Sequence, residues 1–132
     1  LPDLLRPAQA VFARTGGVHA AGLVTATGEV LVVREDVGRH NAVDKVTGAR
    51  VLAGQDPADA CLVVSGRAGF ELVQKAWAAG FGTLVAVSAP TALAVDAARR
   101  ANLLLAGFVR SDRFNVYAPE RLPAATPAAI AR

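Results

Sequence analysis

Hydrophobic residues in this chain follow two patterns, which predict strands and helices in alternation. Short, largely apolar runs are typical of strands in a sheet, and they cover Val18–Thr25, Glu29–Glu35, Cys61–Ser65, Thr83–Ser88, Leu103–Val109 and Phe114–Tyr117. Apolar residues spaced three and four apart predict helices over Leu4–Phe12, Asn41–Leu52, Gly69–Ala79 and Thr91–Ala101. This alternation predicts a three-layer α/β/α domain, whose mixed sheet carries helices on both faces.

Polar residues and glycines mark where these elements begin and end. The turn Ala26-Thr27-Gly28 is expected to join the first two strands into a hairpin. Asn41 and Asp44 have the spacing of a capping box at a helix start, with Asp in place of the usual Glu. The helices are expected to end at residues that accept a left-handed backbone, namely Gly54, Gly80 and Asn102.

The composition is that of one compact globular domain. Of the 132 residues, 53% are hydrophobic and 19% are charged, so the chain can bury a single core. We expect the domain to occupy residues 1–118, and the Pro- and Ala-rich residues 119–132 to form a flexible tail. No run of about 18 apolar residues occurs, so no membrane partner is expected.

The cysteine content and the N-terminal sequence indicate the cellular compartment in which the protein is expected. The chain has a single cysteine, Cys61, and therefore cannot form an internal disulfide. No signal peptide is recognisable either, so we expect a reducing compartment, the cytoplasm. Because the sequence starts with Leu1 and contains no Met, we interpret it as a fragment of a longer protein.

The net charge does not indicate nucleic-acid binding. Fourteen Lys and Arg against 11 Asp and Glu give a formal charge of +3. The arginines are scattered along the sequence, with no basic run interleaved with aromatic residues. We therefore expect no nucleic-acid partner.

Polar loops follow four of the predicted strands, at residues 35–41, 65–69, 88–91 and 110–113. In open α/β sheets, ligands bind in the crevice beyond the carboxyl ends of the strands. Three of these loops lead into helix N-termini, whose free N–H groups favour anions, and arginines can hold phosphate oxygens in bidentate pairs. The pattern favours a site for a phosphorylated ligand, although ordinary loops between strands and helices have the same polar character.

Individual side chains near these loops admit both a functional and a structural interpretation. His19 begins a strand beside two glycines, and its side chain either binds a ligand or has a structural role in the strand. His40 either binds a ligand or belongs to a helix start, and Asp36 is placed to orient Arg39 or His40. Cys61 begins an apolar strand without a basic neighbour, so an inert core thiol is expected.

Several enzyme classes lack their required motifs in this chain. A zinc-dependent nucleobase deaminase needs His-x-Glu and Pro-Cys-x-x-Cys, whereas His19 is followed by Ala20 and Ala21 and the chain has one cysteine. The glycine motif of dinucleotide-binding folds and the serine-centred motif of hydrolases are also absent. We therefore expect no zinc or other bound metal.

Five segments carry motifs in a fixed order. They are residues 15–21 (Thr-Gly-Gly-Val-His-Ala-Ala), 34–45 (beginning Arg-Glu-Asp-Val-Gly-Arg-His-Asn), 65–75 (Ser-Gly-Arg, then Phe-Glu-Leu-Val-Gln-Lys), 87–91 (Val-Ser-Ala-Pro-Thr) and 107–115 (Gly-Phe-Val-Arg, then Arg-Phe-Asn). Through these motifs, residues 5–117 resemble the formate dehydrogenase accessory sulfurtransferase family (FdhD).

The resemblance implies a cytidine-deaminase-like fold and a role in sulfur transfer. Proteins of this family take sulfur as a persulfide from a cysteine desulfurase. They pass it to the Mo-bis(molybdopterin guanine dinucleotide) cofactor destined for formate dehydrogenase. The resemblance thus implies this cofactor as the ligand, GDP as its analogue, and both enzymes as partners. By similarity, the cofactor-binding segment comprises Phe108, Val109, Arg110, Ser111, Asp112 and Arg113. The other expected site residues are His19, Arg39, His40, Ser65, Gly66, Arg67 and Ser88.

The family's persulfide-carrying cysteine has no match in this chain. In the family it lies in a Cys-rich loop upstream of the first helix, and Cys61 does not occupy that position. We therefore expect cofactor binding without sulfur transfer, and no residue of this chain is assigned a catalytic role. Two alternatives stay open: a nucleotide-binding hydrolase or deaminase using Asp36 and His40, and a module that binds formate dehydrogenase. Exposed apolar surface would also favour a homodimer.

Overall fold

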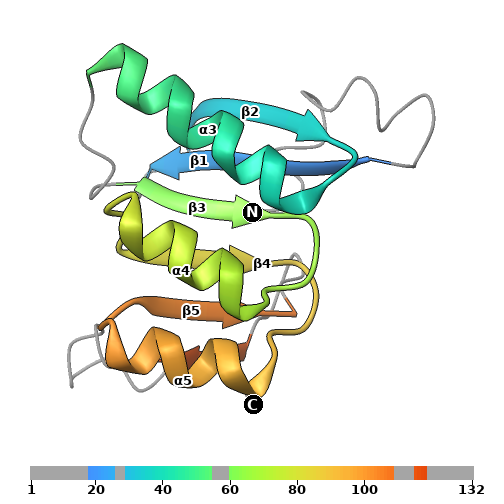
Figure 1. Ribbon diagram of the computed structural model, residues 1–132, viewed down its shortest axis with the longest axis vertical. Coiled ribbons are helices and arrows are strands. Elements are labelled where there is room, and N and C mark those ends of the chain that lie inside the picture. The colour runs from blue at the N-terminus through green and yellow to red at the C-terminus, as the bar shows by residue number, and fades with distance from the viewer. Residues whose placement is uncertain (1–17, 26–28, 55–59, 109–114, 119–132) are drawn as a thin grey trace.

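The computed structural model describes residues 18–25, 29–54, 60–108 and 115–118 (Figure 1). The strands are β1 (His19–Thr25), β2 (Val30–Asp36), β3 (Ala60–Val64), β4 (Thr83–Ala86), β5 (Leu104–Gly107) and β6 (Asn115–Ala118). The helices are α3 (Arg39–Ala53), α4 (Phe70–Ala78) and α5 (Ala92–Arg100). Each of these elements has the type predicted from the sequence, and its bounds differ from the prediction by only one or two residues.

The six strands form one mixed, open sheet in the order β2-β1-β3-β4-β5-β6. β3, β4 and β5 are parallel to one another, whereas β1 is antiparallel to both of its neighbours and β6 is antiparallel to β5. The predicted hairpin of the first two strands is confirmed, with His19 opposite Asp36 in its register. The α/β class and the mixed sheet are thus as predicted.

The three described helices lie on one face of the sheet (Figure 1). Each helix connects two strands that run in the same direction: α3 joins β2 to β3, α4 joins β3 to β4, and α5 joins β4 to β5. Every crossover moves the chain the same way across the sheet, and right-handed crossovers of that kind place their helices on one face. The helix expected over residues 4–12, which would belong to the other layer, lies outside the described residues.

The main core fills the space between this face and the helices. Side chains alternate between the two faces along each strand, so every second strand residue contributes to it. The largest of these fully buried strand residues are Leu23, Leu62, Leu84 and Leu105. Burying one such leucine contributes roughly 1.5–3 kcal/mol. The intervening Val24, Val63 and Val85 form a smaller cluster on the opposite face.

The helix ends follow the predicted C-terminal signals. Gly54 ends α3 with φ 68°, Gly80 follows α4 with φ 89°, and Asn102 follows α5 with φ 53°. Thr91 caps the start of α5, because its hydroxyl accepts a hydrogen bond from the N–H of Ala94 at 3.1 Å. Left-handed residues after these helices let the chain turn back toward the next strand.

The capping box predicted for the first described helix is wrong. α3 begins after Gly38, which has no side chain to accept a hydrogen bond. Asn41 instead donates to the carboxylate of Asp36 at 3.2 Å. Asp44 forms an ion pair with Lys75 of α4 at 3.0 Å. The two polar residues therefore join α3 to its neighbours rather than close its first turn.

The flexible tail, the turn of the first hairpin and the absence of a membrane-spanning segment were also predicted from the sequence. The predicted tail, residues 119–132, lies outside the described residues, as does the 26–28 turn. Among the helices that the structure describes, none combines the length and the apolar character needed to cross a membrane.

Candidate functional site

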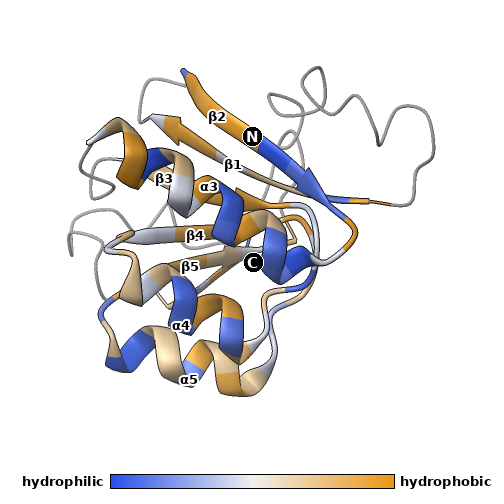
Figure 2. Cartoon of the chain, turned by 45° about the horizontal axis from the view of Figure 1, so that its top comes forward, coloured by the Kyte–Doolittle hydropathy of each residue, from blue (hydrophilic) through white to orange (hydrophobic). Residues whose placement is uncertain are grey.

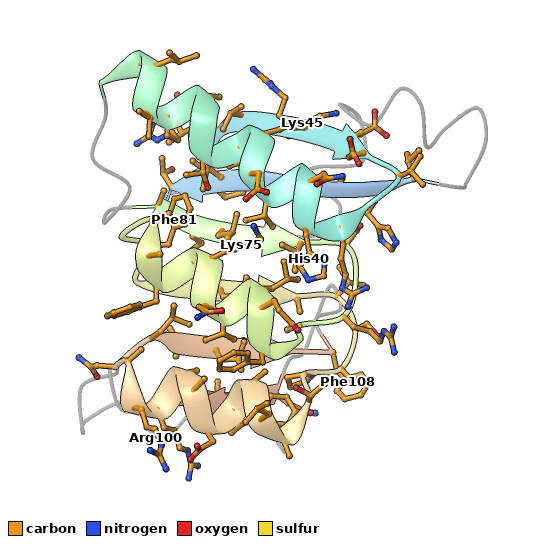
Figure 3. All side chains as sticks on the ribbon, in the orientation of Figure 1. His40, Lys45, Lys75, Phe81, Arg100 and Phe108 are labelled. Atoms are coloured by element: carbon orange, nitrogen blue, oxygen red, sulfur yellow. The ribbon has the colours of Figure 1, made fainter. Side chains whose placement is uncertain are left out.

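The ends of five strands meet at one edge of the sheet. β3, β4 and β5 end there, as does β2, while β1 runs in the opposite direction and begins there with His19. Helices α3, α4 and α5 all start from this edge, because each follows a strand that ends at it. Figure 3 shows His40 near the start of α3 and Phe108 beyond the end of β5, both on this side of the molecule. The polar loops predicted to line a crevice are therefore brought to one edge of the sheet, although they are far apart in sequence.

Backbone hydrogen bonds join the loops that follow β3, β4 and β5. The N–H of Ala68 donates to the carbonyl of Ala89 at 3.2 Å, and the N–H of Thr91 donates to the carbonyl of Ala68 at 3.0 Å. The N–H of Phe108 donates to the carbonyl of Ser88 at 3.2 Å. A displacement of one loop would break these bonds, so the three loops are positioned together.

Gly107 is buried where the loops of β4 and β5 meet. A Cβ at this position would lie 2.9 Å from Cδ of Pro90, and 3.1 Å from both the carbonyl oxygen of Ser88 and Cε2 of Tyr117. The next residue, Phe108, has φ 51°, which is uncommon for a bulky residue, and it is 41% exposed. Strained backbone persists where surrounding contacts hold it, and it is enriched at functional sites.

Ser65 fixes the start of β1 against the end of β3. Its N–H donates to the carbonyl of Ala20 at 3.0 Å, and its hydroxyl accepts from the N–H of Ala20 at 2.9 Å. This pair places His19 beside Gly66, although the two residues are far apart in sequence. Ser65 thus has a structural role, and its predicted contact with a ligand stays a prediction.

His19, Arg39 and Gly66 form a compact group at this edge. A Cβ on Gly66 would lie 3.1 Å from Nδ1 of His19 and 3.4 Å from Cδ of Arg39. Within the described part of the chain, Nε of Arg39 and Nε2 of His40 are buried without a hydrogen-bond partner. Buried polar atoms normally have a partner, so these two nitrogens are candidates to bind a ligand.

The carboxylate of Asp36 organises the loop between β2 and α3. It accepts hydrogen bonds from the N–H of Gly38 at 2.8 Å and from Asn41 at 3.2 Å, and it pairs with Lys45 at 2.9 Å. The hydrogen bond with Lys45, followed by those with Gly38 and Asn41, lowers the pKa of Asp36 from 3.8 to about 2. Asp36 therefore stabilises the loop through these partners, whereas we expected it to orient Arg39 or His40. Figure 2 shows this end of β2 as hydrophilic, in contrast to its apolar first half.

Cys61 lies at the opposite edge of the sheet, at the start of β3 beside Thr83 of β4. Burial raises the pKa of its thiol, while a hydrogen bond with Thr83 acts in the other direction. A thiol with a raised pKa is a weak nucleophile at neutral pH because little thiolate is present. This agrees with the predicted inert thiol, and it places Cys61 outside the candidate site.

The remaining predicted residues divide into two groups. Arg67 is exposed at the β3–α4 loop, and Ser88 lies half-buried after β4. The predicted residues 109–113 lie outside the described part of the chain. Among the residues that are described, no group of three or more His, Cys, Asp or Glu side chains could hold a metal ion.

Sequence reasoning overlooked two charged residues near this edge. Lys45 bonds to the Asp36 carboxylate and also donates to the backbone carbonyl of Glu35 at 2.8 Å. Its spacing of four residues from Asn41 places both on one face of the helix, which was an available signal. Glu71 has an oxygen 3.5 Å from the position that a Cβ on Gly69 would take, and only the tertiary structure shows this proximity.

A comparison with known protein families shows to which family the chain belongs. The model of the FdhD/NarQ family matches residues 1–123. The chain belongs to this family. The resemblance found in the sequence is thereby confirmed for the FdhD/NarQ family.

Curated FdhD proteins are similar to this chain over most of its length. The sulfur carrier protein FdhD of Corynebacterium efficiens is 60% identical over 121 residues, covering 91% of this chain and 44% of the relative. The protein of the same name from Thermoplasma acidophilum is 52% identical over 123 residues, covering 92% and 44%, respectively. The chain thus spans less than half the length of these relatives.

A solved structure from Desulfotalea psychrophila has the same fold. That protein, described as a candidate formate dehydrogenase accessory protein, superposes with a TM-score of 0.81 at 33% identity. The match covers 92% of this chain and 52% of the other. The mixed α/β sheet described above is therefore shared with an FdhD/NarQ relative.

Proposed function

We propose that this chain is the cofactor-binding part of a formate dehydrogenase accessory sulfur carrier, and that it binds the guanine nucleotide of the Mo-bis(molybdopterin guanine dinucleotide) cofactor. The observation that carries the proposal is the convergence of His19, Arg39 and Gly66 with the loops that lead to Phe108. Among the described residues, the buried Nε of Arg39 and Nε2 of His40 have no hydrogen-bond partner, and Gly66 lets the backbone lie close to His19 and Arg39. Such an arrangement suits the phosphate oxygens of a nucleotide.

The chain's residues fit the parts of such a ligand. Arg39 and Arg67 would hold phosphate oxygens through charged hydrogen bonds. Phe108 offers an exposed aromatic side chain, against which a base can stack. Arg110 and Arg113 lie three residues apart after a strand, and we expect them to hold one pyrophosphate. When bound, the cofactor would supply the molybdenum centre that accepts sulfur.

Sulfur transfer is proposed for the whole protein rather than for this chain. Its relatives are named sulfur carrier proteins, and the cysteine that we expect to carry the persulfide has no counterpart in the 132-residue sequence. We propose a cysteine desulfurase as the donor and formate dehydrogenase as the enzyme that receives the finished cofactor, in the cytoplasm. A homodimer would cover apolar surface such as Trp77, which is 60% exposed.

A nucleotide-hydrolysing role has less support from the site. The alternative uses Asp36 together with His40, and Asp36 would act as a general base most effectively with a pKa near the working pH. Asp36 has a pKa of about 2 and is engaged by Lys45, Gly38 and Asn41. A carboxylate held in this way is a poor proton acceptor at neutral pH.

Calorimetric titration with GDP tests the proposed function. GDP should bind, ADP should bind more weakly, and added salt should weaken binding because phosphates supply much of the energy. Arg110→Ala and Arg113→Ala should each cost about 1.5–3 kcal/mol, which is roughly a tenfold to hundredfold loss of affinity. Arg100→Ala is the matched control, since this arginine is exposed on α5 and pairs only with Asp96 in the described structure. No heat and no thermal shift with GDP would refute the proposal.

A further inference from the structure

β2 is the outermost strand on one side of the sheet, because β1 is its only partner among the described strands. An outermost strand presents N–H and C=O groups to which a strand of another molecule can add. The first four residues of β2, 30–33, are all apolar, and Leu31 is 38% exposed. Figure 2 shows this half of the strand as hydrophobic. Apolar strand segments without charge or proline are prone to such pairing.

The strand register shows which backbone groups of β2 face outward. The carbonyl of Ala20 accepts a hydrogen bond from the N–H of Ser65, so the backbone groups of Ala20 point toward β3. The direction alternates along a strand, so those of Gly22 also point toward β3. In the β1–β2 pair, Ala20 lies opposite Glu35 and Gly22 lies opposite Val33. Because such pairs exchange no hydrogen bonds with each other, the N–H and C=O groups of Val33 and Glu35 face outward.

Basic side chains occupy both of these outward carbonyl groups. Nη1 of Arg34 donates to the carbonyl oxygen of Val33 at 2.8 Å, and Nζ of Lys45 donates to that of Glu35 at 2.8 Å. Lys45 belongs to α3, and the carboxylate of Asp36 holds its ammonium at 2.9 Å. A strand added to β2 would have to donate to the same two oxygens. Charged side chains, lysine above all, commonly protect outermost strands in this way.

We propose that Arg34 and Lys45 prevent β2 from pairing with β2 of a second copy of this chain. A second copy is a suitable partner, because its β2 has the same apolar stretch and two identical strands can pair antiparallel about a two-fold axis. Lys45 should contribute more than Arg34, because Asp36 holds Lys45 in place, whereas Arg34 is exposed and bonds to its own neighbour. The proposal does not depend on nucleotide binding, so it can fail separately from the proposed function.

Sedimentation velocity over a series of protein concentrations tests this role. The double variant Arg34→Ala/Lys45→Met should associate at concentrations at least about tenfold lower than the parent, which corresponds to about 1.4 kcal/mol. Arg34→Ala alone leaves the ion pair of Asp36 intact and should show a smaller shift in the same direction. Lys75→Met/Arg100→Ala is the matched control. It removes the same two charges from α4 and α5, where both side chains also pair with aspartates, and it should associate like the parent.

Amide hydrogen exchange shows whether the new association uses β2. When the double variant associates, the N–H of Val33 should become protected, whereas that of Val32, which faces β1, should change little. Adding Val33→Pro removes the outward donor without removing a hydrogen bond to β1, a position where sheets tolerate proline. The triple variant should therefore no longer associate more readily than the parent. Thermal melting identifies the variants that are folded, and the exchange of Val33 decides the matter if the proline variant is not.

Three results would overturn the proposal. The first is a double variant that associates no more readily than the parent or the matched control. The second is an association that leaves the exchange of Val33 unchanged. The third is an association that persists in a folded triple variant, because strand addition at β2 needs the N–H group that the proline lacks.

Discussion

Gly107 offers the sharpest test of how the loops of the site are held. Replacing it with Ala would place a methyl carbon 2.9 Å from Cδ of Pro90 and 3.1 Å from the carbonyl oxygen of Ser88. The oxygen cannot simply move away, because it accepts the hydrogen bond from Phe108. Overpacking of this kind costs about 1–3 kcal/mol. Alanine also lowers the conformational entropy of the unfolded chain, which stabilises the folded protein by about 0.4–1 kcal/mol. We therefore expect a net destabilisation of about 1–2 kcal/mol.

Gly48→Ala is the matched control for this substitution. Gly48 lies within α3, is exposed, and has no atom within 4 Å of the position of a Cβ. Alanine in a helix interior is favoured over glycine by about 0.5–1 kcal/mol, so this variant should be more stable than the parent. Urea denaturation followed by circular dichroism measures both free energies of unfolding. If Gly107→Ala is as stable as the parent while Gly48→Ala behaves as expected, the close packing of the two loops is refuted.

Acid stability and thiol reactivity provide two further predictions. The folded-state pKa of Asp36, about 2, lies below its ordinary value of 3.8, so its ionised carboxylate stabilises the fold above that pH, and the effect is lost as the pH falls toward 2. The difference in melting temperature between the parent and Asp36→Asn should therefore become smaller as the pH falls from 4 to 2. A constant difference down to pH 2 would show that the Asp36 charge does not stabilise the fold. Burial raises the pKa of the Cys61 thiol. An aromatic disulfide reagent at neutral pH should therefore react more slowly with the folded protein than with the protein in urea. Equal rates would show that the thiol is accessible.

Local sequence patterns determined the elements of this fold. Continuous apolar runs such as Leu62-Val63-Val64 identify buried strands, because both faces of a covered strand must be apolar. Gly54 and Asn102 mark helix ends because the left-handed backbone there is costly for most other residues. The motifs of the polar loops were also sufficient to identify the family, since each is contiguous in the sequence. These signals lie within a few residues of the structure they specify.

The site depends on contacts that no local pattern contains. His19 lies beside Gly66 only because β1 is inserted between β2 and β3 and runs opposite to both. Asn41 had the spacing of a cap, yet it bonds to Asp36 because α3 starts two residues earlier than predicted, after a glycine without a side chain. The close packing at Gly107 likewise arises where two crossovers bring separate loops together. Sheet order and strand direction are set by how the whole apolar surface is buried, so the arrangement of the donors at this edge was decided by the tertiary structure alone.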